Sequence, residues 1–199
     1  MTLEIVQAGP DRVRDLVELL ADAFVDDWII AWPFGGPDLK RTRTLFAWLD
    51  DELALDGFVW EVPPARGVAA WIPPTAFERY REVDELVRAR VAEAMPDAAE
   101  RYAAMWDRIE AQLPDEPQWF LDHLAVAEHH RGEGIGAALV RFGLELAARD
   151  GVPATLETSR PSNVPLYEHL GFRVYAEDDV PDGGPHLWFM RADGGRVER

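Results

Sequence analysis

The stretch Trp119–Leu139, WFLDHLAVAEHHRGEGIGAAL, decides the fold. Its first part, Trp119–Val126, is apolar and favours a strand, and an amphipathic helix is predicted from about Gly134 to Arg149. A glycine-rich turn joins the two. A strand, such a turn and a helix start bring several backbone N–H groups and the positive end of a helix to one point. The stretch therefore predicts a site for phosphate oxygens, which the glycines allow to approach the main chain.

Composition limits the classes of protein to consider. A chain of 199 residues, 48 % of them hydrophobic, is expected to form one compact domain with a large core. It has no cysteine, which excludes disulfides, thiolate zinc sites and a cysteine nucleophile and fits a reducing compartment. Residues 1–5 do not resemble a signal peptide, and no apolar run approaches the roughly 18 residues of a membrane span. We expect a cytoplasmic protein without a membrane partner.

The formal net charge of −17 also bears on partners. An acidic chain without a basic stripe repels nucleic acid, so we expect no nucleic-acid partner. The same charge suits a positively charged amine as substrate, although solubility alone is the simpler interpretation.

The rest of the chain alternates irregularly between strand and helix patterns. We predict strands at 3–7, 58–62, 67–72, 154–158, 172–175 and 186–190, and helices at 11–24, 38–56 and 163–170. Residues 26–36 are predicted as a loop or broken helix, and the charged region 76–112 as mostly helical with a break at Pro96. This order predicts a mixed α/β sheet that is not doubly wound.

A dinucleotide-binding fold is one alternative for the glycine turn. Gly132-x-Gly134-x-x-Ala137 matches the loose G-x-G-x-x-G/A fingerprint, and Glu157 follows about 20 residues later. However, residues 127–131 separate the first glycine from the strand, and the chain that remains is too short for the further βαβ units. We therefore do not favour this alternative.

A second interpretation rests on a family resemblance. Arg131-x-x-Gly134-x-Gly136 after an apolar strand is similar to the R/Q-x-x-G-x-G/A motif of the GNAT (Gcn5-related) N-acetyltransferases. Three segments downstream resemble the next strand, helix and turn of the family in the same order: 156–159, 163–168 and 170–172. Pro117-x-Trp119-Phe120-Leu121 and the ending Gly184-Pro185-x-x-Trp188-x-Met190 look closest to the puromycin N-acetyltransferase-like branch.

The resemblance implies an α/β (α+β) GNAT fold. Its central sheet would be mixed, mostly antiparallel and twisted, with about seven strands and helices on both faces. We expect a single acetyltransferase domain, 1–199, with an N-terminal half at 1–75, a helical insertion at 76–113 and an acetyl-CoA-binding half at 117–191. The match is strong over 117–191 and only general before Trp119. Whether the insertion forms a lid or a dimer face is left open, and so is a homodimer.

The resemblance also implies a cofactor site, with acetyl-CoA as co-substrate. Main-chain amides of the turn would hold the pyrophosphate, the end of the strand would pair with the pantetheine arm, and one amide there would face the thioester carbonyl. Asn163 matches the family position that hydrogen-bonds the cofactor. The expected cofactor residues are Leu124, Ala125, Val126, Arg131, Gly132, Glu133, Gly134, Ile135, Gly136, Ala137, Asn163 and Tyr167.

Acetyl transfer to an amine needs a proton donor and a proton acceptor. We expect Tyr167 to be the general acid, because a phenol pKa near ~10 is close enough to the ~8.5 of a thiol to protonate the departing thiolate. Glu157 and His123 are candidates for the base, as is a water chain, while a structural role for either residue remains an alternative. Attack would be direct, because no cysteine can carry an acyl group.

The resemblance also implies that the substrate pocket lies in the first half, lined by the segment between the two N-terminal helices. Trp28, Trp32 and Phe34, with Asp26 and Asp27, would suit a flat cationic amine of a small molecule, although the tryptophans could equally be core. No metal is expected, because the histidines at 129 and 130 lack a third ligand at a sensible spacing. The sequence thus predicts an N-acetyltransferase of unknown acceptor amine, and a non-catalytic acyl-CoA sensor is the alternative function.

Overall fold

The computed structural model describes residues 3–193; the ends of the predicted domain, 1–2 and 194–199, lie outside this range. One seven-stranded sheet has the order β1-β2-β3-β4-β5-β7-β6. The strands are β1 (Val6–Gln7), β2 (Val59–Val62), β3 (Gly67–Ile72), β4 (Trp119–Val126), β5 (Ala154–Thr158), β6 (Arg173–Asp179) and β7 (His186–Ala192). The longer helices are α1 (Val13–Phe24), α3 (Leu39–Leu55), α4 (Phe77–Ala94), α5 (Ala99–Gln112) and α6 (Ile135–Asp150), and the short ones are α2 (Trp28–Ala31) and α7 (Val164–His169).

The pairing of the strands decides between the two folds considered from sequence. Every neighbouring pair in this sheet is antiparallel except β4 and β5. A dinucleotide-binding fold needs a mostly parallel sheet, so that alternative is wrong for this chain. The predicted mixed, mostly antiparallel sheet of about seven strands is confirmed.

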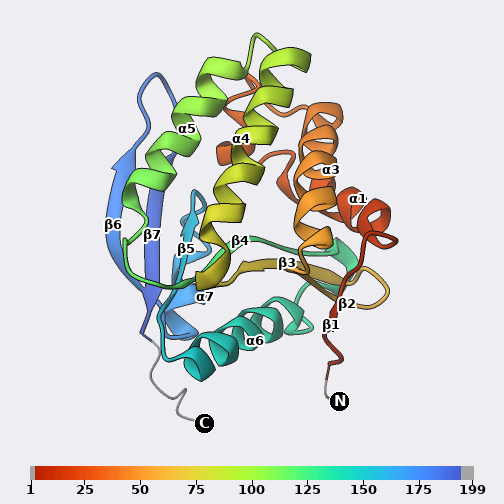
Figure 1. The fold of residues 1–199 in the computed structure, drawn as a ribbon, viewed down its shortest axis with the longest axis vertical. Helices are drawn as coiled ribbons and strands as arrows, with labels where there is room; N and C mark the ends of the chain where they lie inside the picture. Colours follow the sequence, from red (N-terminus) through yellow and green to blue (C-terminus); the bar gives the residue numbers. More distant parts are fainter. Residues whose placement is uncertain (1–2, 194–199) are drawn as a thin grey trace.

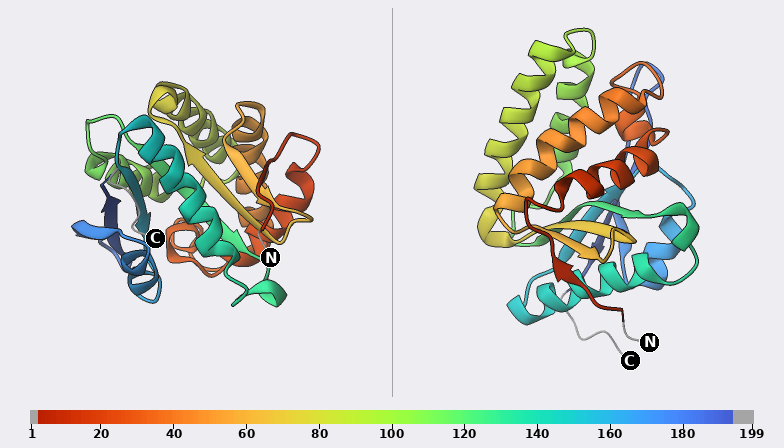
Figure 2. Two further views of the ribbon diagram at one scale, coloured as in Figure 1. Left: turned by 90° about the horizontal axis from the view of Figure 1, so that it is seen from below. Right: turned by 90° about the vertical axis from the view of Figure 1, so that its right-hand side faces the viewer.

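Helices cover both faces of the sheet. Helices α1, α3, α4 and α5 lie above it in Figure 1, while α6 runs below it, and Figure 2 shows the same layers from two further sides. Successive side chains of β3 point to opposite faces of the sheet and so contribute to the core on each side. Val68 and Ala70 pack with the upper helices, whereas Trp71 packs with α6 and α7. At Gly143 of α6, an added Cβ would lie only 2.0 Å from the Trp71 indole, so the glycine lets the helix approach the sheet.

Several element boundaries differ from those predicted. The first strand covers only two residues of the predicted 3–7, and β6 continues four residues past the predicted end at 175. The aromatic segment 26–36 contains a single helical turn, α2, and the Ile29 N–H at its start donates a hydrogen bond to the Asp27 side chain. The predicted break at Pro96 is present, between α4 and α5.

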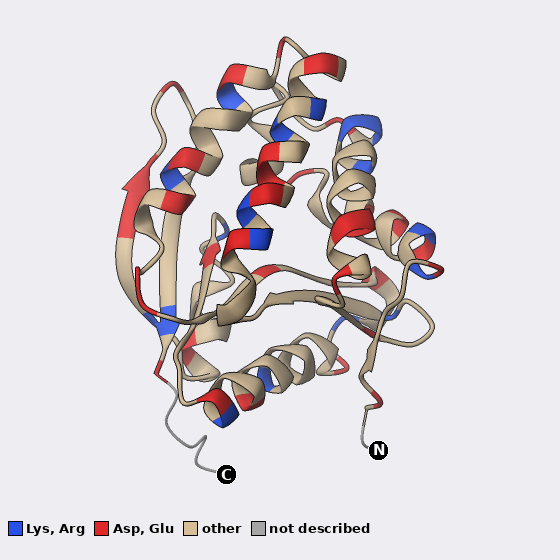
Figure 3. Ribbon diagram, in the orientation of Figure 1, with Lys and Arg blue, Asp and Glu red and all other residues tan. Residues whose placement is uncertain are grey.

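The insertion forms a pair of helices beside α3. Figure 3 shows acidic and basic residues mixed along α4 and α5 and a concentration of acidic ones on β6. Ion pairs connect the two helices, for example Arg81 with Glu110 at 2.7 Å. Their apolar faces complete the core above the sheet, with Val87 and Tyr102 buried there.

Candidate active site

The glycine turn has the geometry that its sequence predicts. Gly132 and Gly134 have φ angles of +85° and +81°, a region that favours glycine. Gly134 precedes α6, and the first hydrogen bond of that helix runs from Ala138 N–H to the Gly134 carbonyl. The N–H groups of the first turn of α6 therefore have no acceptor within the helix and are available to an anion.

A groove of about 390 Å³ starts at this turn. One side is the end of β4, and the other is the loop and helix that follow β5. Its lining residues are Ala23, Phe24, Asp27, Leu124, Ala125, Val126, Arg131, Gly136, Arg160, Ser162, Asn163, Leu166 and Tyr167. Seven of the expected cofactor residues are among them; Gly132, Glu133, Gly134, Ile135 and Ala137 belong to the turn beside the groove, where Ile135 has a buried side chain.

The groove exists because two neighbouring strands separate. Strands β4 and β5 pair in parallel only from Trp119 to Leu121 on one side and from Ala154 to Leu156 on the other. Beyond Leu121, β4 keeps its pairing with β3 on its other edge. The last residues of β4 therefore present an edge to the groove, where an extended ligand can hydrogen-bond to the main chain.

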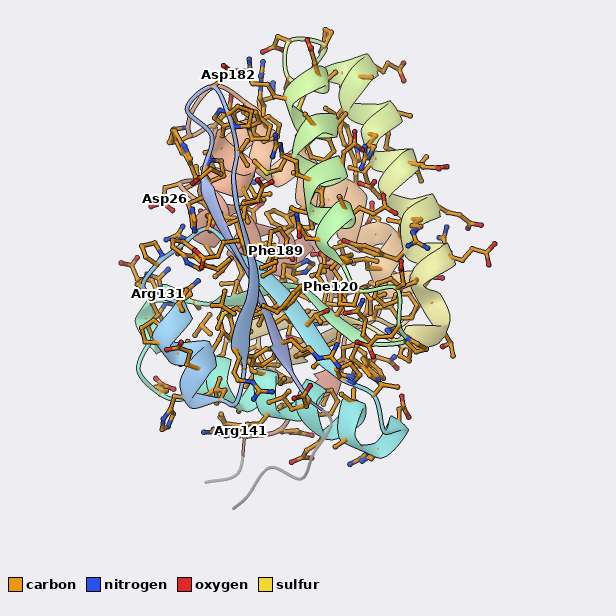
Figure 4. The ribbon with its side chains drawn as sticks, turned by 90° about the vertical axis from the view of Figure 1, so that its left-hand side faces the viewer. Asp26, Phe120, Arg131, Arg141, Asp182 and Phe189 are labelled. Atoms are coloured by element: carbon orange, nitrogen blue, oxygen red, sulfur yellow. The ribbon has the colours of Figure 1, made fainter. Side chains whose placement is uncertain are left out.

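Arg160 is a groove residue that the sequence reasoning missed. Its guanidinium pairs with Asp27 at 2.8 Å and with Asp26 at 2.6 Å, and so ties the loop after β5 to the segment before α2. Figure 4 shows Asp26 and Arg131 on the same side of the molecule. Arg160 lies three residues before Asn163, which was expected to contact the cofactor. This short spacing is the sequence signal that could have predicted Arg160 at an anion site.

A second, smaller cavity of about 70 Å³ adjoins the groove. Both are lined by Phe24, Asp27, Leu124, Asn163 and Tyr167. The other residues around the cavity are Ile29, Ile30, Leu45, Phe46, Leu49, Tyr102, Trp106, Leu121, Asp122, His123, Leu156, Glu157, Thr158 and Ser159. Helices α1, α2, α3 and α5 thus supply an apolar wall, and the ends of β4 and β5 supply acidic and polar groups.

A bulge in β4 places two consecutive polar side chains at this cavity. The register with β3 shifts so that His123 pairs with Ala70 while Leu121 pairs with Trp71, which leaves Asp122 as the extra residue. Alternation is interrupted there. Asp122 accepts a hydrogen bond from the Tyr80 hydroxyl of α4, and His123 lies 3.2 Å from the Asp50 carboxylate of α3, so both point toward the upper helices.

These four residues, Tyr80, Asp122, His123 and Asp50, form a buried polar quartet. His123 Nδ1 lies 2.7 Å from Asp122 Oδ2, and the histidine and both aspartate side chains are at most 3 % exposed. Burial alone would lower the pKa of His123, but Asp50 and Asp122 outweigh burial and raise it to about 10. His123 is therefore protonated at neutral pH.

Glu157 lies at the end of β5 beside the cavity. Its Oε2 atom is buried and has no hydrogen-bond partner among the described residues. Burial, and then the charge of Asp122, raise the pKa of the Glu157 carboxyl well above its usual range. A cation beside this carboxyl would favour its ionised form.

Tyr167 stands where groove and cavity meet. It comes from α7 and packs at 5.8 Å against Phe172, and its side chain is buried. Burial and the neighbouring Glu157 raise the pKa of the Tyr167 phenol above its usual value. Asn163, one turn earlier, donates from its side chain to the Thr158 hydroxyl at 3.2 Å. Tyr167 is thus a protonated hydroxyl between the two spaces.

The three aromatic residues expected to contact substrate, Trp28, Trp32 and Phe34, line neither the groove nor the smaller cavity. The indoles of Trp28 and Trp32 donate to the carbonyls of Gly183 and Asp182 in the turn between β6 and β7, and Phe34 is a core residue. Figure 4 marks Asp182 at the tip of that turn. The structure instead brings the neighbouring isoleucines, 29 and 30, to the cavity.

Within residues 3–193, no group of three or more His, Asp or Glu side chains is arranged to hold a metal ion. In the same range, no helix is long and apolar enough to cross a membrane.

Comparison with known proteins agrees with this geometry. The model of a family described as the acetyltransferase (GNAT) family matches residues 15–172. An N-acetyltransferase of Schizosaccharomyces pombe is 33 % identical over 63 residues, which are 32 % of this chain and 25 % of that protein. The N-acetyltransferase YjcF of Bacillus subtilis is 34 % identical over 72 residues, 36 % of this chain and 51 % of that protein. The matches thus span about a quarter and about half of these relatives.

Solved structures share the fold over the whole chain. A Corynebacterium glutamicum structure described as histone acetyltransferase HPA2 and related acetyltransferase has a TM-score of 0.69 at 20 % identity, with 100 % of both chains covered. Arylalkylamine N-acetyltransferase 2 from Aedes aegypti has a TM-score of 0.64 at 14 % identity and covers 98 % of this chain and 100 % of its own. At these identities the likeness concerns the fold alone.

Proposed function

This chain belongs to the GNAT family of acetyltransferases, and we propose that it transfers the acetyl group of acetyl-CoA directly to a primary amine of a small molecule. The proposal rests on one observation: the groove and the smaller cavity adjoin at Tyr167, Asn163 and Leu124, which line both. The groove offers an anion site at one end, and the cavity offers a carboxyl without a partner. A donor in the groove and an acceptor in the cavity would thus meet at the phenol.

The groove supports binding of acetyl-CoA. Its pyrophosphate would lie at the glycine turn, near Arg131, and its pantetheine arm along the free edge of β4 from Leu124 to Val126. One main-chain N–H of that edge would donate to the thioester carbonyl and stabilise the oxyanion that forms there.

Glu157 is the proposed base. The acceptor arrives as an ammonium ion and must lose a proton before its nitrogen can attack the carbonyl carbon. A carboxyl whose pKa lies well above its usual range has a proton affinity closer to that of an amine, which favours the transfer. His123, the other candidate from sequence, is protonated at neutral pH because its pKa is raised to about 10, and it cannot accept a proton there.

Tyr167 is the proposed acid. The amine nitrogen bonds to the carbonyl carbon and forms a tetrahedral oxyanion. Its collapse breaks the carbon–sulfur bond, the thiolate takes the phenolic proton, and the second proton that the nitrogen must lose returns to the Tyr167 phenolate. The raised pKa of Tyr167 keeps the hydroxyl protonated, but it also makes full transfer less favourable than the ordinary value of ~10 suggests. We therefore propose that Tyr167 donates a hydrogen bond to the sulfur throughout and releases its proton as the bond breaks.

The likeness to the puromycin-like branch stays a prediction, because neither curated relative bears on it. Three measurements test the proposed reaction: calorimetry with acetyl-CoA, thiol release over a panel of primary amines, and the same assay for Glu157→Gln. We expect acetyl-CoA to bind and at least one amine to release thiol, with kcat/KM at least tenfold lower in Glu157→Gln. Binding of acetyl-CoA without turnover of any amine would favour the sensor.

A further inference from the structure

The smaller cavity combines an apolar wall with one acidic group, Glu157, that has no cationic partner among the described residues. Of the described residues that line it, the titratable acids are Asp27, Asp122 and Glu157, and His123 is its sole basic group. Asp27 already pairs with Arg160, and the positive charge of His123 is shared between Asp50 and Asp122. Glu157 is therefore the acid with a buried oxygen that still lacks a partner.

From this arrangement we propose that the acceptor is a small apolar primary monoamine, about the size of a butylamine to a hexylamine. The inference rests on the proposed function and names the substrate class of the same site. The ammonium group would lie at Glu157, on the side of the cavity that Asp122 also lines. The hydrocarbon body would pack against the apolar wall.

The wall argues against a second polar group on the substrate. Its side chains are Phe24, Ile29, Ile30, Leu45, Phe46, Leu49, Tyr102 and Trp106. A second ammonium placed among them would lose its hydration without gaining an acid, and a carboxylate would lose it without gaining a base. No lysine or arginine among the described residues lines the cavity, so an amino acid or a phosphorylated amine would find no counterion there.

The volume argues against a bulky acceptor. The cavity measures about 70 Å³, so the rigid ring systems of a large acceptor do not fit inside it. A nucleoside or an aminosugar would have to displace α3 or α5, whose Leu45 and Tyr102 side chains are buried in the core. A narrow, flexible hydrocarbon chain would need smaller adjustments of the side chains in the wall.

Three acceptors of equal length provide the test. Hexylamine, 1,6-diaminohexane and 6-aminohexanoate differ only at the far end, which is apolar, cationic and anionic respectively. We expect kcat/KM for hexylamine to exceed that for each of the others by at least 30-fold, with acetyl-CoA saturating. Equal or higher kcat/KM for the diamine or the amino acid would overturn the proposal, and so would turnover confined to an aminoglycoside or an aminonucleoside.

A variant pair locates the apolar end. Leu49 lies one turn after Leu45 on α3 and is only half-buried, so it tolerates a polar replacement better than its neighbours. Leu49→Glu supplies an acid there, and Leu49→Gln is the matched neutral control. We expect Leu49→Glu to raise the diamine-to-hexylamine ratio of kcat/KM at least tenfold over Leu49→Gln, and an unchanged ratio would contradict the placement.

The two proposals fail in different ways. If acetyl-CoA binds and some other class of amine is acetylated, acetyl transfer stands and the monoamine proposal is wrong. If acetyl-CoA does not bind, or binds with no turnover of any amine, both are wrong. Thermal melting of each Leu49 variant with and without acetyl-CoA confirms that the folded protein is being compared.

Discussion

The groove and the smaller cavity lie side by side but are built in different ways. The groove is formed largely by main chain: a glycine turn, a helix start and the free edge of β4. The cavity is formed by side chains from four helices and two strands, and charged groups buried behind it hold its acidic end in place. The shape of the groove therefore depends on the backbone conformations that its glycines allow. The shape of the cavity depends on the identity of the side chains that these separate elements bring together.

The difference in construction predicts a difference in sensitivity. Main-chain hydrogen bonds do not titrate between pH 5 and 10, so the groove should be insensitive to pH over this range. The quartet beside the cavity contains a histidine that is protonated only because two acids surround it. The free energy of unfolding should therefore depend on pH because of the histidine beside the cavity.

The largest expected effect concerns His123. Its folded pKa of about 10 lies above the ordinary value of ~6.5, so the histidine stabilises the fold fully below pH 6.5 and loses this contribution as pH rises through about 10. A shift of this size corresponds to on the order of 5 kcal/mol. Urea unfolding of the wild type and His123→Gln at pH 6.5 and 10 measures it. The difference in free energy of unfolding between the wild type and His123→Gln should be smaller at pH 10 than at pH 6.5. An equal difference at both pH values would contradict the prediction.

The next effect concerns the groove. Gly136→Val places a branched side chain in it and should raise the Kd for acetyl-CoA about a hundredfold, close to 2.7 kcal/mol. Gly136→Ala is the control, because its added Cβ would lie 3.4 Å from a Val126 methyl group, which is ordinary contact, and Kd should change only a few-fold. Calorimetry measures both. Wild-type affinity in Gly136→Val would show that acetyl-CoA binds elsewhere.

Tyr167→Phe tests the point where the two spaces meet. Removing the hydroxyl should lower kcat tenfold or more while KM for acetyl-CoA stays within a few-fold, because the phenol is expected to act on the departing sulfur and to add little to binding. Steady-state kinetics with a reactive amine measures both constants. Unchanged kcat would remove Tyr167 from the role of acid.

The smallest effect concerns Trp28. Its indole donates to the Gly183 carbonyl at 3.2 Å, so Trp28→Phe should lower the free energy of unfolding by about 0.5–1 kcal/mol. We expect kcat/KM to stay within twofold, because Trp28 does not line the cavity. A large rise in the KM for the amine would instead support the substrate-binding role predicted from sequence.

The two regions also differ in how far the sequence predicts them. The groove could be predicted because glycines at fixed spacing between a strand and a helix limit the backbone to few conformations, and Asn163 and Tyr167 follow at a short distance along the chain. Arg160 was missed although it lies in the same segment. The sheet followed from apolar runs bounded by proline and glycine.

The cavity could not be predicted, for a physical reason. Asp50, Tyr80 and Asp122 lie on three separate elements, and no local pattern relates them. The β-bulge that points Asp122 and His123 to the same side of the sheet has no recognisable signal in the sequence of a largely apolar strand. Aromatic residues such as Trp28 were expected to contact the substrate because aromatic walls suit amines. In the structure, the indole N–H groups of Trp28 and Trp32 donate to carbonyls in the turn between β6 and β7, which is distant in sequence.

The bulge in β4 has an evolutionary consequence. Removing Asp122 would restore strict alternation: Phe120 would still face the upper helices, Leu121 and Leu124 would still face α6, and His123 would occupy the remaining upper position. A single-codon insertion into an ordinary strand is therefore sufficient to create the acidic partner of His123 without reversing any buried residue. Lineages that differ by this one codon can keep the same scaffold while gaining or losing a charge beside the acceptor.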